Sequence, residues 1–322
     1  MLTISVPQVP VNIVRGTHEQ LIAFLILNAW PSHFGLPVLL LVVVFSKKVQ
    51  RHITFVNLCL AFIIIGISSS LLVYAGRIEG PEPPRFVCLL QASLLYGMPG
   101  ISSMAALMLV LHMFLVIRGH YHGEEYRDRD HVLRLWVMSV SPYIVFFVCV
   151  IVTAVIGASN PGRVSRNRRF FYCSLDFLPF TNTLTIVSAI ILFATFVFGV
   201  WTVVILCKQW KIQKDNTATS GSLDFSLPIR IVAFGFYIII ALSLSLLSIK
   251  SPQSPVPDLV IASAATVVML IFGTQRDILQ VICFWKWEKR SPKRVEPLDS
   301  ATSTVDLKSE FMPCSQNPYF VA

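Results

Sequence analysis

The stretch from Cys88 to Ile117 reads CLLQASLLYGMPGISSMAALMLVLHMFLVI and decides the fold. It contains no Asp, Glu, Lys or Arg. A helix of about thirty residues rises roughly 45 Å, at about 1.5 Å per residue. The hydrocarbon core of a bilayer needs only about 20 helical residues. The stretch therefore predicts a long, tilted membrane helix that ends near Arg118.

The middle of this predicted helix is built from small residues, which are Gly97, Gly100, Ser102, Ser103, Ala105 and Ala106. Small residues let helix backbones approach closely, and close approach is how helices associate in lipid. We therefore expect other helices to cross this one at its middle. The alternative is a lipid-facing span whose glycines have no packing role.

The composition is that of a membrane protein. Apolar residues make up 55% of the 322 residues and charged residues 13%, whereas a soluble domain carries about 25% charge. Seven apolar stretches are long enough, or nearly so, to cross a membrane: 21–45, 53–76, 87–117, 135–156, 181–207, 231–249 and 259–273. None of the 26 basic and 17 acidic residues lies within them, and a charge at mid-bilayer costs about 2.5–3.5 kcal/mol. The sequence predicts an all-α membrane protein with a seven-transmembrane helix bundle over residues 21–273.

Basic residues are distributed unequally between alternate loops. The side that includes the C-terminus carries 18 Lys and Arg residues, and the side of the N-terminus carries 8. Because basic residues favour the cytoplasm, we expect a plasma-membrane protein with residues 1–20 outside and the C-terminus inside. Loop 157–180 opposes this rule, since its four arginines would face outward: Arg163, Arg166, Arg168 and Arg169. These arginines could attract an anionic ligand or form a solvated loop.

The positions of the cysteines test this topology. Of seven cysteines, only Cys88 and Cys173 fall at the predicted outer face. Disulfides persist in oxidising compartments, so we expect these two to pair. The alternative is two free thiols.

The outer N-terminus, the seven spans and a cysteine pair joining the third span to the second outer loop together resemble the G-protein-coupled receptors. Two short motifs narrow the resemblance. The run FGTQRDIL, Phe272 to Leu279, and the run VYAG, Val73 to Gly76, are similar to span ends of fungal seven-helix receptors, including basidiomycete pheromone-receptor-like and orphan groups. The resemblance implies a cell-surface receptor that senses an extracellular ligand and signals to a heterotrimeric G protein.

The chain departs from rhodopsin-like receptors at three motifs. The third span ends LVIRGHYHG without Asp-Arg-Tyr, the sixth has no Trp-x-Pro, and the seventh has no Asn-Pro-x-x-Tyr. These departures keep open a second hypothesis, which is a seven-helix membrane carrier or scaffold without G-protein coupling.

Residues 274–289 predict a short amphipathic eighth helix along the inner leaflet. Thr274 and Asp277 have the spacing of a capping box, and an apolar run with flanking Trp and Lys follows, as in helices that lie on a membrane surface. Cys283 within it is a candidate for palmitoylation, the alternative being a buried free thiol. Residues 290–322 are polar and rich in Pro and Ser, and we expect a disordered cytoplasmic tail.

No residue set indicates catalysis, a metal site or a cofactor, so we do not expect an enzyme. The seventh span has no lysine for a retinal Schiff base. Only His33 and His112 lie in predicted spans, and no intramembrane carboxylate accompanies them. The basic residues lie in loops and the tail beside the spans, which favours membrane lipid over nucleic acid as a partner.

A receptor would have its pocket at the outer end, beneath loop 157–180. The candidate pocket residues are His33, Gln91, Tyr96, Met98, Phe236 and Tyr237. Gln91 lies about one turn below Cys88, and we expect it to be the polar side chain nearest a ligand. An aromatic pocket with few polar groups suits a small apolar molecule or a lipidated peptide. For His33 the alternative is a backbone hydrogen bond or a side chain that reaches the membrane interface. For the other five residues it is ordinary interhelical packing.

The inner face would meet the G protein. The candidate effector residues are Arg118, Arg127, Arg129, Lys211 and Arg276. Arg118 closes the third span and could act as a switch, or as an anchor whose long side chain reaches the interface.

Overall fold

The computed structural model describes residues 17–46, 52–78, 82–122, 128–166, 169, 171–216, 230, 233–241, 243, 255–274, 278–279 and 281. Most of the predicted eighth helix at 274–289, including Cys283, and the predicted tail at 290–322 lie outside these residues, as does most of the N-terminal segment 1–20.

The described chain is built almost entirely from helices, which follow the predicted apolar stretches closely. The first half contains α1 (His18–Trp30), a π-helix η1 (Pro31–Gly35), α2 (Leu36–Phe45), α3 (Ile53–Ser69), α4 (Leu71–Tyr74) and α5 (Arg85–His122). The second half contains α6 (Asp128–Ser159), a short 3-10 helix η2 (Pro161–Arg163), β1 (Val164–Ser165), β2 (Ser174–Leu175), α7 (Leu178–Asn216), α9 (Val256–Ala262) and α10 (Ala264–Gly273). Residues 233–241 are also helical.

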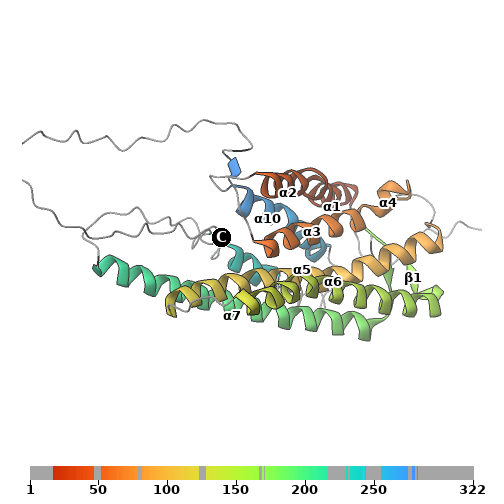
Figure 1. The fold of residues 1–322 in the computed structure, drawn as a ribbon. Coiled ribbons are helices and arrows are strands. Elements are labelled where there is room, and N and C mark those ends of the chain that lie inside the picture. The colour runs from red at the N-terminus through yellow and green to blue at the C-terminus, as the bar shows by residue number, and fades with distance from the viewer. Residues whose placement is uncertain are drawn as a thin grey trace, which may run out of the picture.

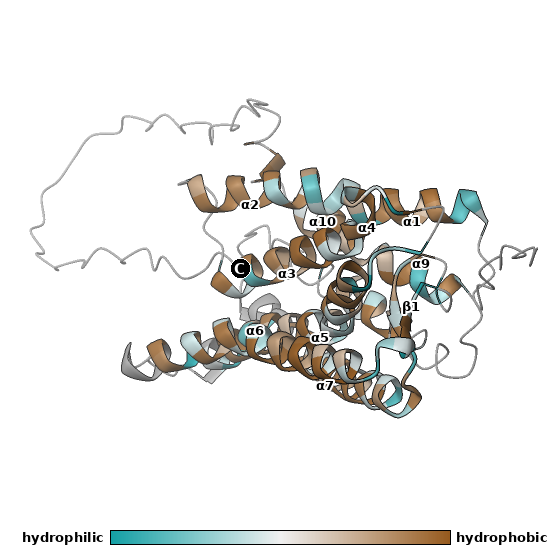
Figure 2. Cartoon of the chain, turned by 90° about the vertical axis from the view of Figure 1, so that its right-hand side faces the viewer, coloured by the Kyte–Doolittle hydropathy of each residue, from teal (hydrophilic) through white to brown (hydrophobic). Residues whose placement is uncertain are grey.

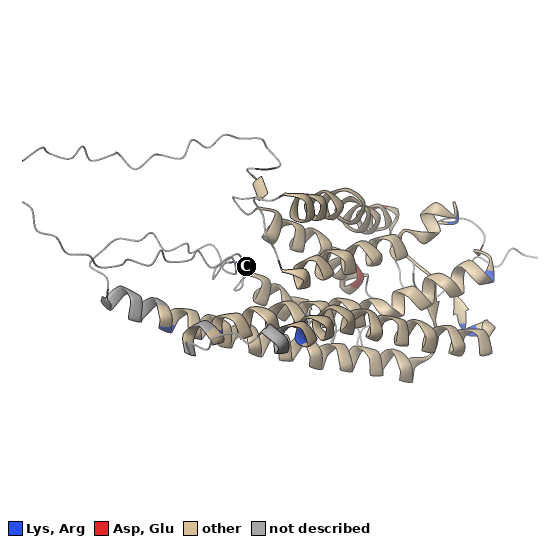
Figure 3. Ribbon diagram, in the orientation of Figure 1, with Lys and Arg blue, Asp and Glu red and all other residues tan. Residues whose placement is uncertain are grey.

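Five helical segments of the described chain are long and apolar enough to cross a membrane, which confirms the prediction of an all-α membrane protein. Two of them combine consecutive elements: α1, η1 and α2 form one, and α9 and α10 form another. The five are His18–Phe45, Arg85–Gly119, Val132–Ser159, Leu178–Gln209 and Val256–Gly273, and Ile53–Ser69 is a shorter apolar helix. Most of their residues are hydrophobic (Figure 2), and charged residues are absent from most of their length (Figure 3). Large apolar side chains point outward, as at Phe147 and Ile190, which are 57% and 63% exposed. Such a surface suits lipid and not water.

Helix α5 lies at the centre of the packing, with α3, α6 and α7 against it (Figure 1). The small residues at its middle make this possible. A Cβ at Gly97 would lie 2.6 Å from the Phe146 ring of α6, and one at Gly100 would lie 2.9 Å from Val145 Cγ1. The prediction that other helices cross α5 at its middle is therefore confirmed.

The first apolar helix contains an irregular turn. Thr17 and Gln20 form a capping box at its start, which satisfies two backbone donors reciprocally. Pro31 has no backbone N–H to donate, and its ring crowds the carbonyl four residues earlier, which disturbs a regular helix. The chain adopts a π-turn here, in which the Leu36 N–H donates to the carbonyl of Pro31. His33 within this turn contacts the hydroxyl of Tyr74 at the end of α4.

The VYAG run has a local structural role, because it ends α4. Gly76 adopts a left-handed conformation with φ of 62°, which costs glycine little. The Gly76 N–H donates to Val73 O at 3.0 Å, and the Arg77 N–H donates to Leu72 O at 2.9 Å. The bond that spans five residues is characteristic of a Schellman motif, so this glycine stops the helix and turns the chain.

Candidate functional site

A disulfide between Cys88 and Cys173 joins the start of α5 to the loop after α6, as predicted. We refer to the described residues between Asn160 and Phe177 as the roof. Within the roof, β1 and β2 pair antiparallel, with Val164 opposite Leu175 and Ser165 opposite Ser174. The disulfide lies next to β2, so it fixes this hairpin over one end of the bundle, which we call the disulfide end (Figure 1).

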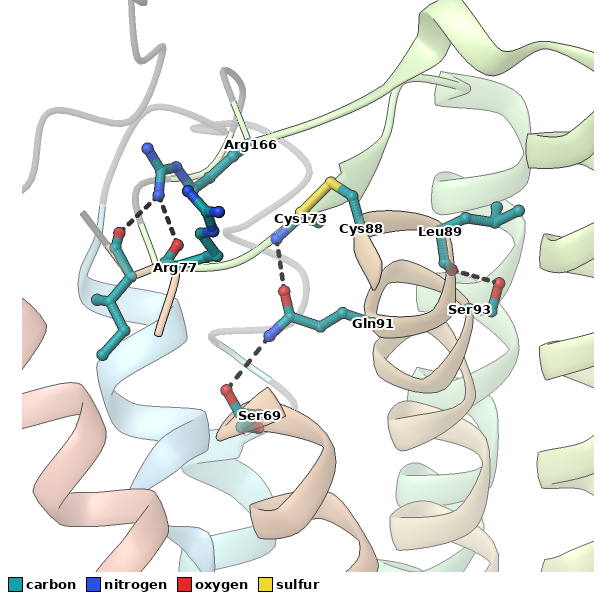
Figure 4. Close-up of a disulfide and its surroundings, with 9 residues drawn as sticks. Ser69, Arg77, Cys88, Leu89, Gln91, Ser93, Arg166 and Cys173 are labelled. Carbon is teal, nitrogen blue, oxygen red and sulfur yellow. Dashed lines mark hydrogen bonds between the residues drawn. A yellow bond between two sulfur atoms is a disulfide. The ribbon is translucent and has the colours of Figure 1, made fainter. Parts of the chain in front are cut away.

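Gln91 is a tether for the roof. Its Oε1 accepts from the Cys173 N–H at 3.0 Å, and its Nε2 donates to the Ser69 carbonyl at 3.3 Å (Figure 4). The side chain is 0% exposed and is not among the residues that line the cavity described below. The structure therefore gives Gln91 a different role from the predicted ligand contact: it joins α5 to the roof and to the end of α3.

The arginines of loop 157–180 have partners within the protein wherever the structure describes them. Arg166 Nη1 donates to the carbonyls of Arg77 and Ile78, at 2.8 and 2.7 Å (Figure 4). The guanidinium of Arg163 lies 5.6 Å from the centre of the Phe177 ring, within the range of a cation–π contact. These arginines hold the roof in place, which neither sequence interpretation of the loop anticipated.

A buried ion pair joins the roof to α9. Arg169 Nη1 donates to Asp258 Oδ2 at 3.0 Å, and the Tyr172 hydroxyl donates to Asp258 Oδ1 at 3.1 Å. The Arg169 and Asp258 side chains are only 13% and 9% exposed. Asp258 also lies in the first turn of α9, where the helix dipole favours a negative charge.

The protonation states of this cluster follow from its surroundings. The neighbouring Tyr172 and Asp258 raise the pKa of Arg169, so the guanidinium stays charged. Burial and the nearby Asp258 carboxylate raise the pKa of Tyr172, which keeps its phenol neutral and able to donate. Sequence reasoning missed this cluster. The sequence feature that could have indicated it is Asp258, an acidic residue directly before the predicted span 259–273, together with the arginine-rich loop 157–180 on the same predicted face.

Beneath the roof lies a cavity of about 270 Å³. Its walls come from α1, α3, α5, α7, residues 234–241, α9 and α10. Most of the lining is apolar, as at Phe62, Ile65, Leu192, Phe234 and Val268. Polar groups are fewer, and they include Asn28, Ser69, Ser174 and Ser188. A concave, largely apolar site with a few placed polar groups is typical of a small-molecule site.

Three of the six predicted pocket residues line this cavity: Tyr96, Met98 and Tyr237. The Tyr96 hydroxyl also donates to Leu175 O of the roof at 2.7 Å. Gln91 and His33 do not line it: Gln91 accepts from the Cys173 N–H of the roof, and His33 contacts Ala29 O of its own helix and the Tyr74 hydroxyl of α4. Phe236 was expected in the pocket but is 67% exposed and points away from it, since its neighbour Tyr237 occupies the inward face of the helix.

Three of the predicted effector residues, Arg118, Arg129 and Lys211, lie on helices towards the opposite end of the bundle. Arg118 is exposed near the end of α5, which suits either a contact surface or an interfacial anchor. Arg129 and Lys211 lie in α6 and α7, where the structure describes the helix but not their side chains, and Arg127 and Arg276 lie outside the described residues. Arg230 Nη1 donates to Ile271 O at 2.8 Å and Nη2 to Thr274 O at 3.3 Å, which ties the chain before residues 233–241 to the end of α10.

Within the described part of the chain, no group of three or more His, Cys, Asp or Glu side chains is placed to hold a metal ion. No protein-family model matches the sequence, and no curated protein is significantly similar to it. Function is therefore inferred from the residues and the geometry described above.

Proposed function

We propose that this chain is a cell-surface receptor of seven transmembrane helices that binds a small extracellular ligand in the cavity and signals to a heterotrimeric G protein. The observation that carries the proposal is the cavity beneath a roof that a disulfide anchors to the central helix. The proposed orientation puts the disulfide end outside the plasma membrane and the C-terminus inside. A disulfide is stable in an oxidising compartment, which supports this orientation.

Seven spans are consistent with the described helices. The five membrane-length helices account for spans one, three, four, five and seven. The helix Ile53–Ser69, continued by α4, coincides with the second predicted span. The helical residues 233–241 fall within the sixth. The FGTQRDIL and VYAG runs support a place among fungal receptors of this architecture.

The geometry suggests how a ligand could be sensed across the membrane. Tyr237 contributes to the cavity and its hydroxyl donates to Val260 O of α9 at 3.3 Å. At the opposite end, Arg230 holds the end of α10. A ligand that binds one arrangement of these helices better than another shifts the population towards it. The contact of Arg230 with α10 would then change, and with it the surface offered to a G protein.

Nucleotide exchange tests the proposal. Membranes that contain the protein and candidate Gα subunits are exposed to a library of small, largely apolar molecules. We expect at least one compound to accelerate exchange. Ser188→Leu, which adds volume to the cavity lining, should abolish the response. The matched control is Val187→Leu, on the neighbouring residue that is 47% exposed, and it should respond like the wild type.

Two results would count against a receptor. If compounds bind the purified protein but no Gα subunit responds, a carrier or scaffold becomes the better interpretation. If a compound accelerates exchange equally in the wild type and in Ser188→Leu, the cavity is not the sensing site.

A further inference from the structure

Two hydroxyl groups in the cavity wall have no hydrogen-bond partner. Among the described residues, Ser69 and Ser174 line the cavity and are 2% and 3% exposed, and neither Oγ forms a hydrogen bond. Two other cavity hydroxyls are satisfied locally: Ser103 Oγ donates to Pro99 O at 2.6 Å, and Thr185 Oγ1 donates to Thr181 O at 2.9 Å. Leaving a buried polar group unsatisfied costs about 1–3 kcal/mol, so this pair calls for an explanation.

The two serines belong to one corner of the cavity. Gln91 binds the Ser69 carbonyl with one end of its amide and the Cys173 N–H with the other (Figure 4). Ser174 follows Cys173 directly in β2. Three elements that are distant in sequence therefore place both serines at the junction of α3, α5 and the roof. A hydroxyl can both donate and accept, so this corner suits a neutral oxygen-bearing group.

The charge of the cavity restricts the ligand further. Arg169 and Asp258 are the only charged side chains among the described residues that line it, and they bind each other at 3.0 Å. Their formal charges cancel. An ion that entered would lose its hydration without gaining a charge of its own to pair with, and burying an unpaired charge is strongly unfavourable. The remaining wall is largely apolar and fits a hydrocarbon body.

We propose that the cavity binds an uncharged, amphipathic small molecule whose hydroxyl or carbonyl head hydrogen-bonds Ser69 and Ser174 once their side chains turn towards it, and whose hydrocarbon body lies against the apolar wall. This inference rests on the proposed function, because it names the class of ligand for the same site. It predicts that fatty acids and amines of the same length bind much more weakly, and the volume of about 270 Å³ suits a small molecule.

The test compares three probes with the same chain and different heads: 1-octanol, octanoate and octylamine. The purified full-length protein in lipid nanodiscs is titrated with each probe, and the shift of the thermal unfolding midpoint gives the dissociation constant. We expect 1-octanol to raise the midpoint in a saturable way, and the two ions to raise it at least tenfold less effectively.

Serine variants separate binding from folding. Ser69→Ala and Ser174→Ala should each weaken 1-octanol binding about three- to tenfold, because each removes one hydrogen bond to the head. Neither should lower the midpoint of the unliganded protein, since the lost hydroxyl has no partner there. Ser70→Ala is the matched control: its Oγ is also buried without a partner, but Ser70 is not among the residues that line the cavity. Ser70→Ala should bind 1-octanol like the wild type, and comparison with this variant removes effects of the probe on the bilayer.

The outcomes discriminate between this inference and the receptor proposal. Equal or greater stabilisation by octanoate or octylamine, no stabilisation by 1-octanol, or unchanged 1-octanol binding in both cavity variants would overturn the inference. Selective 1-octanol binding without nucleotide exchange on any Gα subunit would retain the ligand class and reject the receptor. Nucleotide exchange that only charged compounds accelerate would retain the receptor and reject the ligand class.

Discussion

Gln91 satisfies two backbone groups with one neutral side chain. Its amide accepts from the roof and donates to α3 without leaving a buried charge. The sequence singled it out as a polar side chain about one turn below Cys88, and the prediction drawn from this position was a contact with a ligand. The sequence could not supply its partners, since Ser69 and Cys173 are brought to it only by tertiary packing.

Gln91→Ala should destabilise the protein by about 2–4 kcal/mol, because it leaves two buried backbone groups without their side-chain partner. The thermal unfolding midpoint of the purified protein measures this. Ser93→Ala is the control on the same helix, because Ser93 Oγ donates only to Leu89 O, four residues earlier, at 2.8 Å. If the two variants unfold at the same temperature, Gln91 is not a tether.

His52 is a titratable group near the opposite end of the bundle. Its Nδ1 accepts from the Thr54 N–H at 3.3 Å and so caps the start of α3. Its ring stacks on His112 of α5, with centroids 3.3 Å apart. Burial, together with the charge of Arg134 on α6, lowers the pKa of His52 from 6.5 to about 4. The folded protein therefore keeps His52 neutral at neutral pH.

Acidification should destabilise the protein through His52. Between the folded pKa of about 4 and the unfolded value of 6.5, the unfolded state binds more protons, so stability rises with pH in this window. The contribution of His52 is fully present above about pH 6.5 and is lost as the pH falls towards 4. The unfolding midpoint should fall over this range. His52→Asn retains a capping side chain that does not titrate and should show a shallower fall; an identical fall would assign the effect to other groups.

At the scale of single helices, the apolar stretches predicted where helices form, but not which face of each helix points inward. The lipid and the protein interior are both apolar, so hydrophobicity does not distinguish the two faces. Tyr237 lines the cavity while Phe236 faces outward, and nothing in the sequence favours one of these two aromatic residues over the other. In α5 the small residues indicated which face points inward, because close contact between helices needs small side chains.

Gly97→Ala should destabilise the contact of α5 with α6. Its Cβ would lie 2.6 Å from Phe146 Cδ2 and 3.0 Å from Val150 Cγ2, and overpacking of this kind costs about 1–3 kcal/mol. Gly235→Ala is the control, because among the described residues no heavy atom beyond its own stretch of helix lies within 4 Å of its Cβ position. The unfolding midpoint should fall only in the first variant. Phe146→Leu should restore part of the loss in Gly97→Ala, and the absence of any rescue would point to a cause other than this contact.

At the scale of the whole molecule, the pairing of Cys88 with Cys173 followed from topology alone, because only these two cysteines share the predicted outer face. The other contacts of the roof could not be predicted from the topology. Arg166 binds backbone carbonyls 88 and 89 residues away in sequence, and Arg169 binds a carboxylate 89 residues away. Such partners depend on how all the helices assemble, and local sequence patterns do not specify that assembly.

Cys88→Ser and Cys173→Ser should each reduce the amount of folded protein at the cell surface, and the double variant should be no worse than either single variant, because the two residues act through one bond. Surface labelling of intact cells and the unfolding midpoint measure this. Cys207→Ser is the control, since Cys207 is a free, exposed cysteine. Losses that add in the double variant would mean that each cysteine acts separately.

The ion pair between Arg169 and Asp258 joins the roof to α9 beside the cavity. If a ligand passes this point, it passes it both on arrival and on departure. A barrier of this kind lowers the rate constants for entry and for exit by the same factor, so it leaves the equilibrium occupancy of the cavity unchanged. Lowering this barrier would shorten the time that each molecule stays bound and would quicken its entry equally. The duration of a response would then be set by the roof, and the concentration that evokes it by the walls beneath.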